Sequence, residues 1–164
     1  MHISAKKIIL DCVDLALKVS SPNQTLPRHL PTDNKTAVTV ISVGKAASSM
    51  AVEFEKYWQG SIKGLAVVPY HYREPLKYFE QIEASHPIPD QMSVRAAGKV
   101  FELTNSLNSS DTVFVLLSGG SSSLICYPAG SINFLEKQKI NCALIRSGAN
   151  INEINCVRKQ LSAI

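Results

Sequence analysis

Short apolar runs alternate along the chain with stretches in which apolar residues recur at helical spacing. The runs are rich in β-branched residues or leucine and predict strands at residues 36–42, 64–69, 81–85 and 113–117. The helical spacing predicts helices at residues 3–19, 46–58, 91–103, 132–146 and 152–161. Strands that alternate with helices pair in parallel, because the helices form the crossovers. The pattern therefore predicts an α/β fold, a Rossmann-like parallel sheet flanked by helices.

The first helix, residues 3–19, is amphipathic. Its apolar side chains at helical spacing are Ile8, Ile9, Cys12, Val13, Ala16 and Leu17. We expect this face to pack on the rest of the domain. Residues 20–35 contain three prolines among Asn, Ser and Thr, which predicts a surface connection without regular structure.

A tight turn follows the run at residues 113–117. The run has no polar alternation, which is typical of a central strand buried on both faces of a parallel sheet. It stops at two glycines and resumes as a serine-rich helix start. Glycines allow a sharp turn, so we expect the amides of residues 119–122 to point at an anion, assisted by the positive end of the next helix. This segment predicts a phosphate or carboxylate site.

A second glycine turn follows the strand at residues 36–42. Lys45 is expected near the carboxyl end of that strand, where open α/β sheets bind ligands. The turn is not a Walker A loop, because Thr39 replaces the earlier glycine and Ala46 replaces the Ser or Thr after the lysine. Two interpretations of Lys45 stay open: it neutralises a phosphate, or it begins a helix in solvent.

Other chemistries are weighed against an anion site. A nucleophile elbow at residues 119–123 lacks its partners, because the last histidine is His86 and the last aspartate is Asp111. No strand is followed by the G-x-G-x-x-G of NAD-dependent reductases. The interpretation that the glycine turn only connects the strand to the next helix, without binding a ligand, also stays open. Three interpretations of His86 stay open: a ligand, an acid/base or a packed loop residue. Two stay open for Arg158 and Lys159: they bind an anion, or they lie on a solvated helix face.

Composition narrows the class of protein. The 164 residues are 45% hydrophobic and 18% charged, which suits one globular domain, and the net charge of +4 comes from scattered residues rather than a nucleic-acid-binding run. The four cysteines form no C-x-x-C pair, so we expect core thiols in a cytoplasmic protein and no metal site. Asp11 and Asp14 interrupt the first apolar stretch, which excludes a signal peptide or membrane span there.

Five sequence blocks together resemble the N-terminal part of the type II glycerate kinases. This glycerate 2-kinase family includes members that carry the label hydroxypyruvate reductase. The blocks occur in the family's order, from about Val38 onward: V-G-K-A-A at 43–47, E-A-S-H-P-I-P-D at 83–90, S-G-G-S-S at 118–122, L-I-R-S-G-A at 144–149 and E-I-N-C-V-R-K-Q-L-S at 153–162.

The resemblance implies an ATP- and Mg²⁺-dependent kinase that phosphorylates D-glycerate at its 2-hydroxyl. It implies a small-molecule substrate, with neither nucleic acid nor a membrane as partner. Lys45 matches an active-site lysine of the family. The phosphate- and substrate-binding positions that match are His86, Ser118, Gly119, Gly120, Ser121 and Ser122.

Two departures from the family qualify that expectation. Ser121 replaces the third loop glycine, so the loop is strained or reshaped if that position needs a positive φ. The family also continues with a K-G-G segment and a second domain of the MOFRL type. We therefore expect residues 1–164 to be a truncated N-terminal Rossmann-like domain that is weak or inactive alone. The alternative is a non-catalytic fragment that binds a small anion or dimerises through an open strand edge.

Overall fold

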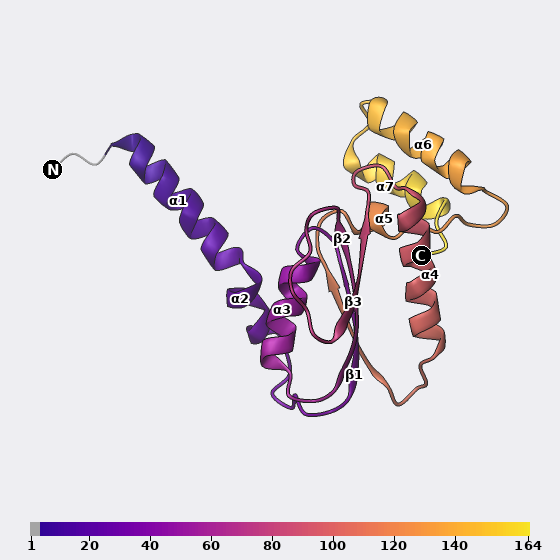
Figure 1. The fold of residues 1–164 in the computed structure, drawn as a ribbon. Coiled ribbons are helices and arrows are strands. Elements are labelled where there is room, and N and C mark those ends of the chain that lie inside the picture. Colours follow the sequence, from indigo (N-terminus) through magenta and orange to yellow (C-terminus); the bar gives the residue numbers. More distant parts are fainter. Residues whose placement is uncertain (1–3) are drawn as a thin grey trace.

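The computed structural model describes residues 4–164, which form one parallel sheet with helices on both faces (Figure 1). Its strands are β1 (Val38–Val43), β2 (Ile62–Pro69), β3 (Phe79–Ala84) and β4 (Thr112–Leu117). They lie in the order β3-β2-β1-β4, and every neighbouring pair is parallel. The predicted α/β class and parallel sheet are confirmed.

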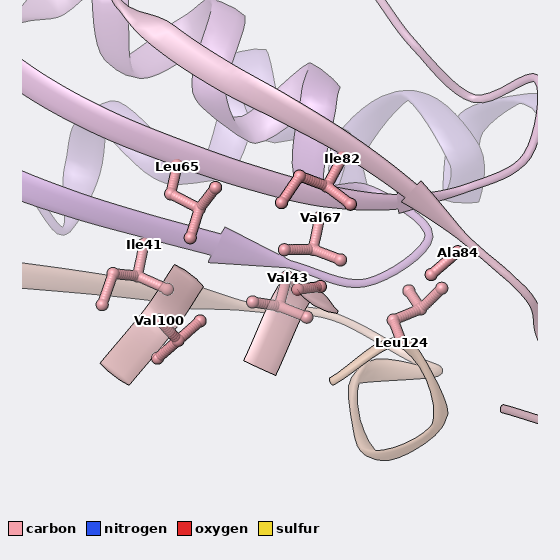
Figure 2. Packing of buried hydrophobic residues seen from close by; sticks show 9 residues of the cluster. Ile41, Val43, Leu65, Val67, Ile82, Ala84, Val100 and Leu124 are labelled. Carbon is pink, nitrogen blue, oxygen red and sulfur yellow. The ribbon is translucent and has the colours of Figure 1, made fainter. Parts of the chain in front are cut away.

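One face of the sheet is covered by α4 (Gln91–Asn105). Figure 2 shows the buried side chains on this face, where those from three strands meet Val100 of α4 and Leu124. The strand residues are Ile41, Val43, Leu65, Val67, Ile82 and Ala84. Since the sheet alternates its side chains between faces, β-branched and small residues at alternate positions fill this layer.

The other face is covered by α3 (Ala47–Tyr57). An aromatic cluster closes it: the ring centroids of Phe54 and Trp58 lie 5.3 Å apart, and each lies 5.2 Å from that of Phe114. The Trp58 indole N–H donates to the carbonyl of Thr36 over 2.9 Å, so its buried polar atom is satisfied.

The strand β4 lies at the edge of the sheet, which corrects the prediction of a central strand buried on both faces. The central, fully buried strand is β1. Val113, Val115 and Leu117 are exposed on the α4 side of β4, at 37%, 56% and 62%. An apolar run shows that a strand is suited to burial, but not that another element covers it. Here α4 does not extend over β4, so this face of the strand stays exposed.

The first helix, α1 (Ala5–Ser20), projects away from the sheet (Figure 1). It has no buried residue, so the expected packing on the rest of the domain is wrong; the predicted first residue, Ile3, lies outside the described residues. Amphipathic spacing identifies an apolar face without identifying its partner. No helix within residues 4–164, α1 included, is long and apolar enough to cross a membrane.

The connection after α1 is more regular than predicted. A short helix α2 (Pro22–Thr25) and a 3-10 turn η1 (Leu26–Arg28) lie within residues 20–35. Proline is tolerated in the first turn of a helix, where its missing N–H has no partner to lose. The three prolines therefore did not exclude helical turns.

Polar caps fix the ends of the later helices. Asp90 caps α4, and it forms a capping box with Ser93. The last two helices are α6 (Phe134–Arg146) and α7 (Ile151–Gln160), and both begin at asparagine capping boxes. Because Asn133 is the cap, α6 begins at Phe134 rather than at residue 132. Figure 1 shows α6 and α7 beyond the end of the sheet that carries α5 (Ser121–Leu124).

Candidate anion site at the carboxyl ends of β1 and β4

The two glycine turns predicted from the sequence meet in the fold. The main-chain N–H of Lys45 donates to the carbonyl of Gly119 over 2.9 Å, and that of Ala46 donates to Ser118 Oγ over 3.0 Å. The chain runs from β1 to β2 on one side, whereas β4 lies on the other side of β1. The turns therefore lie at the switch point of the sheet, where α/β proteins bind ligands.

Gly44 permits this close approach. Its φ is +126°, and a Cβ atom there would lie 2.1 Å from Ser118 Oγ and 2.6 Å from the Ser118 carbonyl oxygen. Any side chain would push the two turns apart. The glycine before Lys45 is thus required by contact with β4, in addition to its turn geometry.

The loop after β4 takes its positive φ at Gly120, with a value of +95°. Ser121 is the first residue of α5, and among the described residues the single non-glycine residue with a positive φ is His71. The Ser121 hydroxyl lies 2.7 Å from the carbonyl of Ser118 and 2.9 Å from that of Val43. Serine at the family's third glycine position therefore leaves the backbone unstrained and adds a hydrogen bond between the turns.

The loop amides are available to a ligand. Within residues 4–164, the N–H groups of Gly119, Gly120, Ser121 and Ser122 donate to no protein acceptor. The first bonds of α5 are those from Ser123 and Leu124 to the carbonyl of Gly120. Free, adjacent amides at such a turn form a concave anion-binding arrangement.

His86 packs directly on this loop. A Cβ atom on Gly120 would lie 2.6 Å from His86 Cδ2 and 3.0 Å from Nε2, so the imidazole occupies the space that the glycine leaves. Burial lowers the pKa of His86, and the positive charges of Lys45 and Arg158 lower it further. His86 is therefore neutral at pH 7, and the crevice around it is electropositive.

A pocket of about 360 Å³ adjoins the loop, between β4 and α5 on one side and α6 and α7 on the other. Ser121, Ser122, Arg158 and Lys159 line it together, so the basic pair on α7 faces the loop. Its lining includes Lys137 but no aspartate or glutamate. The structure therefore brings the basic pair of α7 to the predicted loop, a placement that the sequence left open.

Lys137 and Asn141 were not identified from the sequence. Lys137 is 3% exposed, and its Nζ donates to the carbonyl of Tyr127 over 2.8 Å and to Ser162 Oγ over 2.9 Å. Burial lowers the pKa of Lys137 and raises that of the neighbouring Cys126 thiol. Lys137 and Asn141 are four residues apart and therefore lie on one face of α6. This spacing was the sequence signal that could have identified them together.

The cysteines divide between core and surface. Cys126 is buried and Cys142 is half-buried, as the prediction of core thiols requires. Cys12 and Cys156 are exposed, so the prediction is wrong for these two. Both lie on helices, α1 and α7, where spacing alone does not show which face is covered.

The residues at the crevice fit a phosphate group but not a magnesium ion. Lys45, whose charge acts on His86, and the four loop amides supply positive charge and N–H donors. In the part of the chain that the structure describes, no three His, Cys, Asp or Glu side chains come together as a metal site. Mg²⁺ prefers carboxylate and other oxygen ligands, which this cationic crevice does not provide.

The fold and the crevice define a parallel α/β domain with a candidate anion site at its switch point. The family model described as "Domain of unknown function (DUF4147)" matches residues 8–164. The chain therefore belongs to the DUF4147 family.

Relatives of this family carry the names that the sequence resemblance predicts. The chain is 40% identical to the D-glycerate 2-kinase of Thermotoga maritima over 98% of its own length and 39% of the relative's. It is 37% identical to an Agrobacterium vitis protein whose name refers to hydroxypyruvate reductase, over 99% and 37% of the two lengths. The resemblance to the type II glycerate kinases is confirmed.

A solved structure shares the fold. The crystal structure of the Thermotoga maritima glycerate kinase superposes with a TM-score of 0.77 at 38% identity, over 96% of this chain and 38% of that one. The chain thus spans less than two fifths of the length of that kinase.

Proposed function

We propose that this chain is the N-terminal domain of a glycerate 2-kinase, which transfers the γ-phosphoryl group of ATP to the 2-hydroxyl of D-glycerate. The match to a D-glycerate 2-kinase over 39% of that protein's length supports the reaction. In this proposal, residues 1–164 contribute an anion-binding half-site, and full turnover requires residues that the longer relatives supply.

The observation that carries the proposal is the hydrogen bond between the main chains of Lys45 and Gly119. It fixes a lysine at the end of β1 beside free amides at the end of β4. Phosphoryl transfer is catalysed mainly by positioning and by neutralising negative charge. A lysine and amide donors held in one crevice supply both.

Each residue has a role in the proposed site. The Lys45 ammonium neutralises phosphate oxygens, and the amides of Gly119 to Ser122 donate to them. Ser118 and Ser121 hold the two turns together through their hydroxyl groups. His86 supports the loop as a neutral imidazole against Gly120. We assign no step to Mg²⁺, because the crevice offers it no carboxylate.

A coupled assay with D-glycerate, ATP and Mg²⁺ tests this function. The wild-type chain is compared with Lys45→Ala, and with Lys139→Ala as a control at an exposed position on α6. We expect weak turnover that is lost in Lys45→Ala and kept in Lys139→Ala. Equal turnover in both variants would contradict the role of Lys45, and phosphate transfer to the 3-hydroxyl would contradict the proposed product.

Self-association is the second candidate, and it is favoured by the uncovered apolar row on β4. Val113, Val115 and Leu117 lie along an edge strand whose outer main-chain groups are unpaired within the described sheet. A second copy of the chain presents the same edge about a two-fold axis, so we propose that two β4 strands pair.

Exposed thiols at Cys12 and Cys156 suit the reducing cytoplasm, where we place the protein.

A further inference from the structure

The pocket between β4–α5 and α6–α7 holds an arginine that the proposed phosphate site does not use. Arg158 is half-buried in the pocket wall with Ser121 and Ser122 across from it. In the described part of the chain, no aspartate or glutamate forms an ion pair with Arg158. A guanidinium in a pocket without acidic side chains attracts an anionic ligand.

The guanidinium of Arg158 is held by one side only. Its Nε–H donates to Asn141 Oδ1 over 3.2 Å, and Asn141 is itself 4% exposed. A buried amide that supports the Nε side leaves the two terminal Nη groups for a ligand. These present parallel N–H donors, which match the two oxygens of a carboxylate.

Arg158 also acts on the same loop as Lys45. Both positive charges lower the pKa of His86, whose ring packs on Gly120. Two cations from distant parts of the sequence thus flank one small loop. A ligand with two anionic or acceptor groups a few bonds apart is able to use both.

We propose that Arg158 binds the carboxylate of a small 2-hydroxy acid, while Lys45 and the loop amides bind the phosphate of the donor. This proposal rests on the proposed kinase function and names the substrate contact within it. A lysine is a compact point charge that suits phosphate, whereas the planar fork of arginine selects a carboxylate. In a 2-hydroxy acid the hydroxyl lies on the carbon next to that carboxylate, so the same contact fixes the position of the reacting group.

Binding to the full 164-residue chain tests the proposal. The ligands are D-glycerate, glycerol, which lacks the carboxylate, lactate, which lacks the 3-hydroxyl, and inorganic phosphate. The chains are wild type, Arg158→Gln, Arg158→Lys and, as a matched control, Arg146→Gln at an exposed position on α6. Affinity is measured by calorimetry, and the Nε–H signal of Arg158 is followed by NMR.

The wild-type chain is expected to bind D-glycerate and lactate but not glycerol. Arg158→Gln and Arg158→Lys are expected to lower the affinity for D-glycerate and for lactate about tenfold or more, because a charged bidentate contact is lost. Inorganic phosphate is expected to bind both variants as it binds wild type, and Arg146→Gln is expected to change nothing. Circular dichroism confirms that each variant is folded.

Several outcomes would overturn the proposal. Unchanged D-glycerate affinity in folded Arg158→Gln would remove the assigned contact, whatever the fate of the kinase function. An equal loss of phosphate and carboxylate affinity would make Arg158 a general anion contact. If lactate binds through Arg158 but D-glycerate shows no turnover with the longer kinase's remaining domain supplied, the carboxylate contact stands and the proposed kinase function fails.

Discussion

The main-chain N–H of Lys45 donates to the carbonyl of Gly119 over 2.9 Å, which joins the turn after β1 to the turn after β4. The two residues come from adjacent parallel strands that are far apart in sequence. The bond holds the two glycine turns side by side, and together they form one crevice at the switch point of the sheet.

Gly44→Ala is expected to destabilise the fold by roughly 2–4 kcal/mol, because the new methyl group meets the Ser118 main chain at a positive φ. Urea denaturation measures the change. Gly98→Ala is the control: it lies in α4 with no neighbouring atom within 4 Å of the new Cβ and is expected to stabilise by about 0.5–1 kcal/mol. Similar effects of the two substitutions would contradict the close approach of the turns.

Gly120→Ala is expected to displace His86 and to weaken phosphate binding, because its Cβ would lie 2.6 Å from the imidazole. NMR of the His86 ring protons and calorimetry with inorganic phosphate measure the two effects. Gly119→Ala has open space around its Cβ and should leave the His86 signals in place. Unmoved His86 signals in folded Gly120→Ala would show that the contact does not hold the ring.

The free energy of unfolding should fall as the pH drops below about 6.5. Burial, Lys45 and Arg158 hold the pKa of His86 below its ordinary value of 6.5, so the unfolded chain takes up the proton first. The contribution of neutral His86 is full above that value and is lost as the pH falls through the folded pKa. Urea denaturation from about pH 5 to about pH 8 measures it, and His86→Gln should flatten this part of the profile. Bound phosphate should raise the pKa of His86, and an unchanged value would contradict its proximity.

Lys137→Met is expected to destabilise the chain by about 1–3 kcal/mol, because the Ser162 hydroxyl loses its donor and the Tyr127 carbonyl loses one donor while it keeps its bond from the Ala163 N–H. Hydrogen exchange should accelerate first in α7 and the segment after it. Lys139→Met, at an exposed position on the same helix, should change stability little. Equal exchange rates in the two variants would mean that Lys137 does not hold this segment.

If two β4 strands pair as proposed, Val115→Lys is expected to give a monomer, because it places a charge in the uncovered row of β4. Sedimentation velocity measures the oligomeric state. Leu135→Lys, at a similarly exposed leucine on α6, should leave the dimer intact. A wild-type chain that stays monomeric at every concentration would exclude pairing through β4.

Local sequence signals predicted most of the elements, since each depends on neighbouring residues. The glycine turn before Lys45 is of this kind. The burial of β4 and α1 was predicted wrongly, because an apolar pattern states a capacity for burial and not which surface covers it. The crevice could not be predicted because it depends on the order of the strands. Lys137 could not be identified because its burial depends on tertiary packing and not on its neighbours in the sequence.

A titration of the ¹⁵N-labelled chain with ATP, followed by amide NMR, tests the central claim most directly. The proposed phosphate site predicts saturable shifts of the amides of Gly119 to Ser122 and of Lys45. These shifts should disappear in Lys45→Ala and persist in Lys139→Ala. Loop amides that stay fixed at saturating ATP, or that shift equally in both variants, would contradict a phosphate site at the junction of β1 and β4.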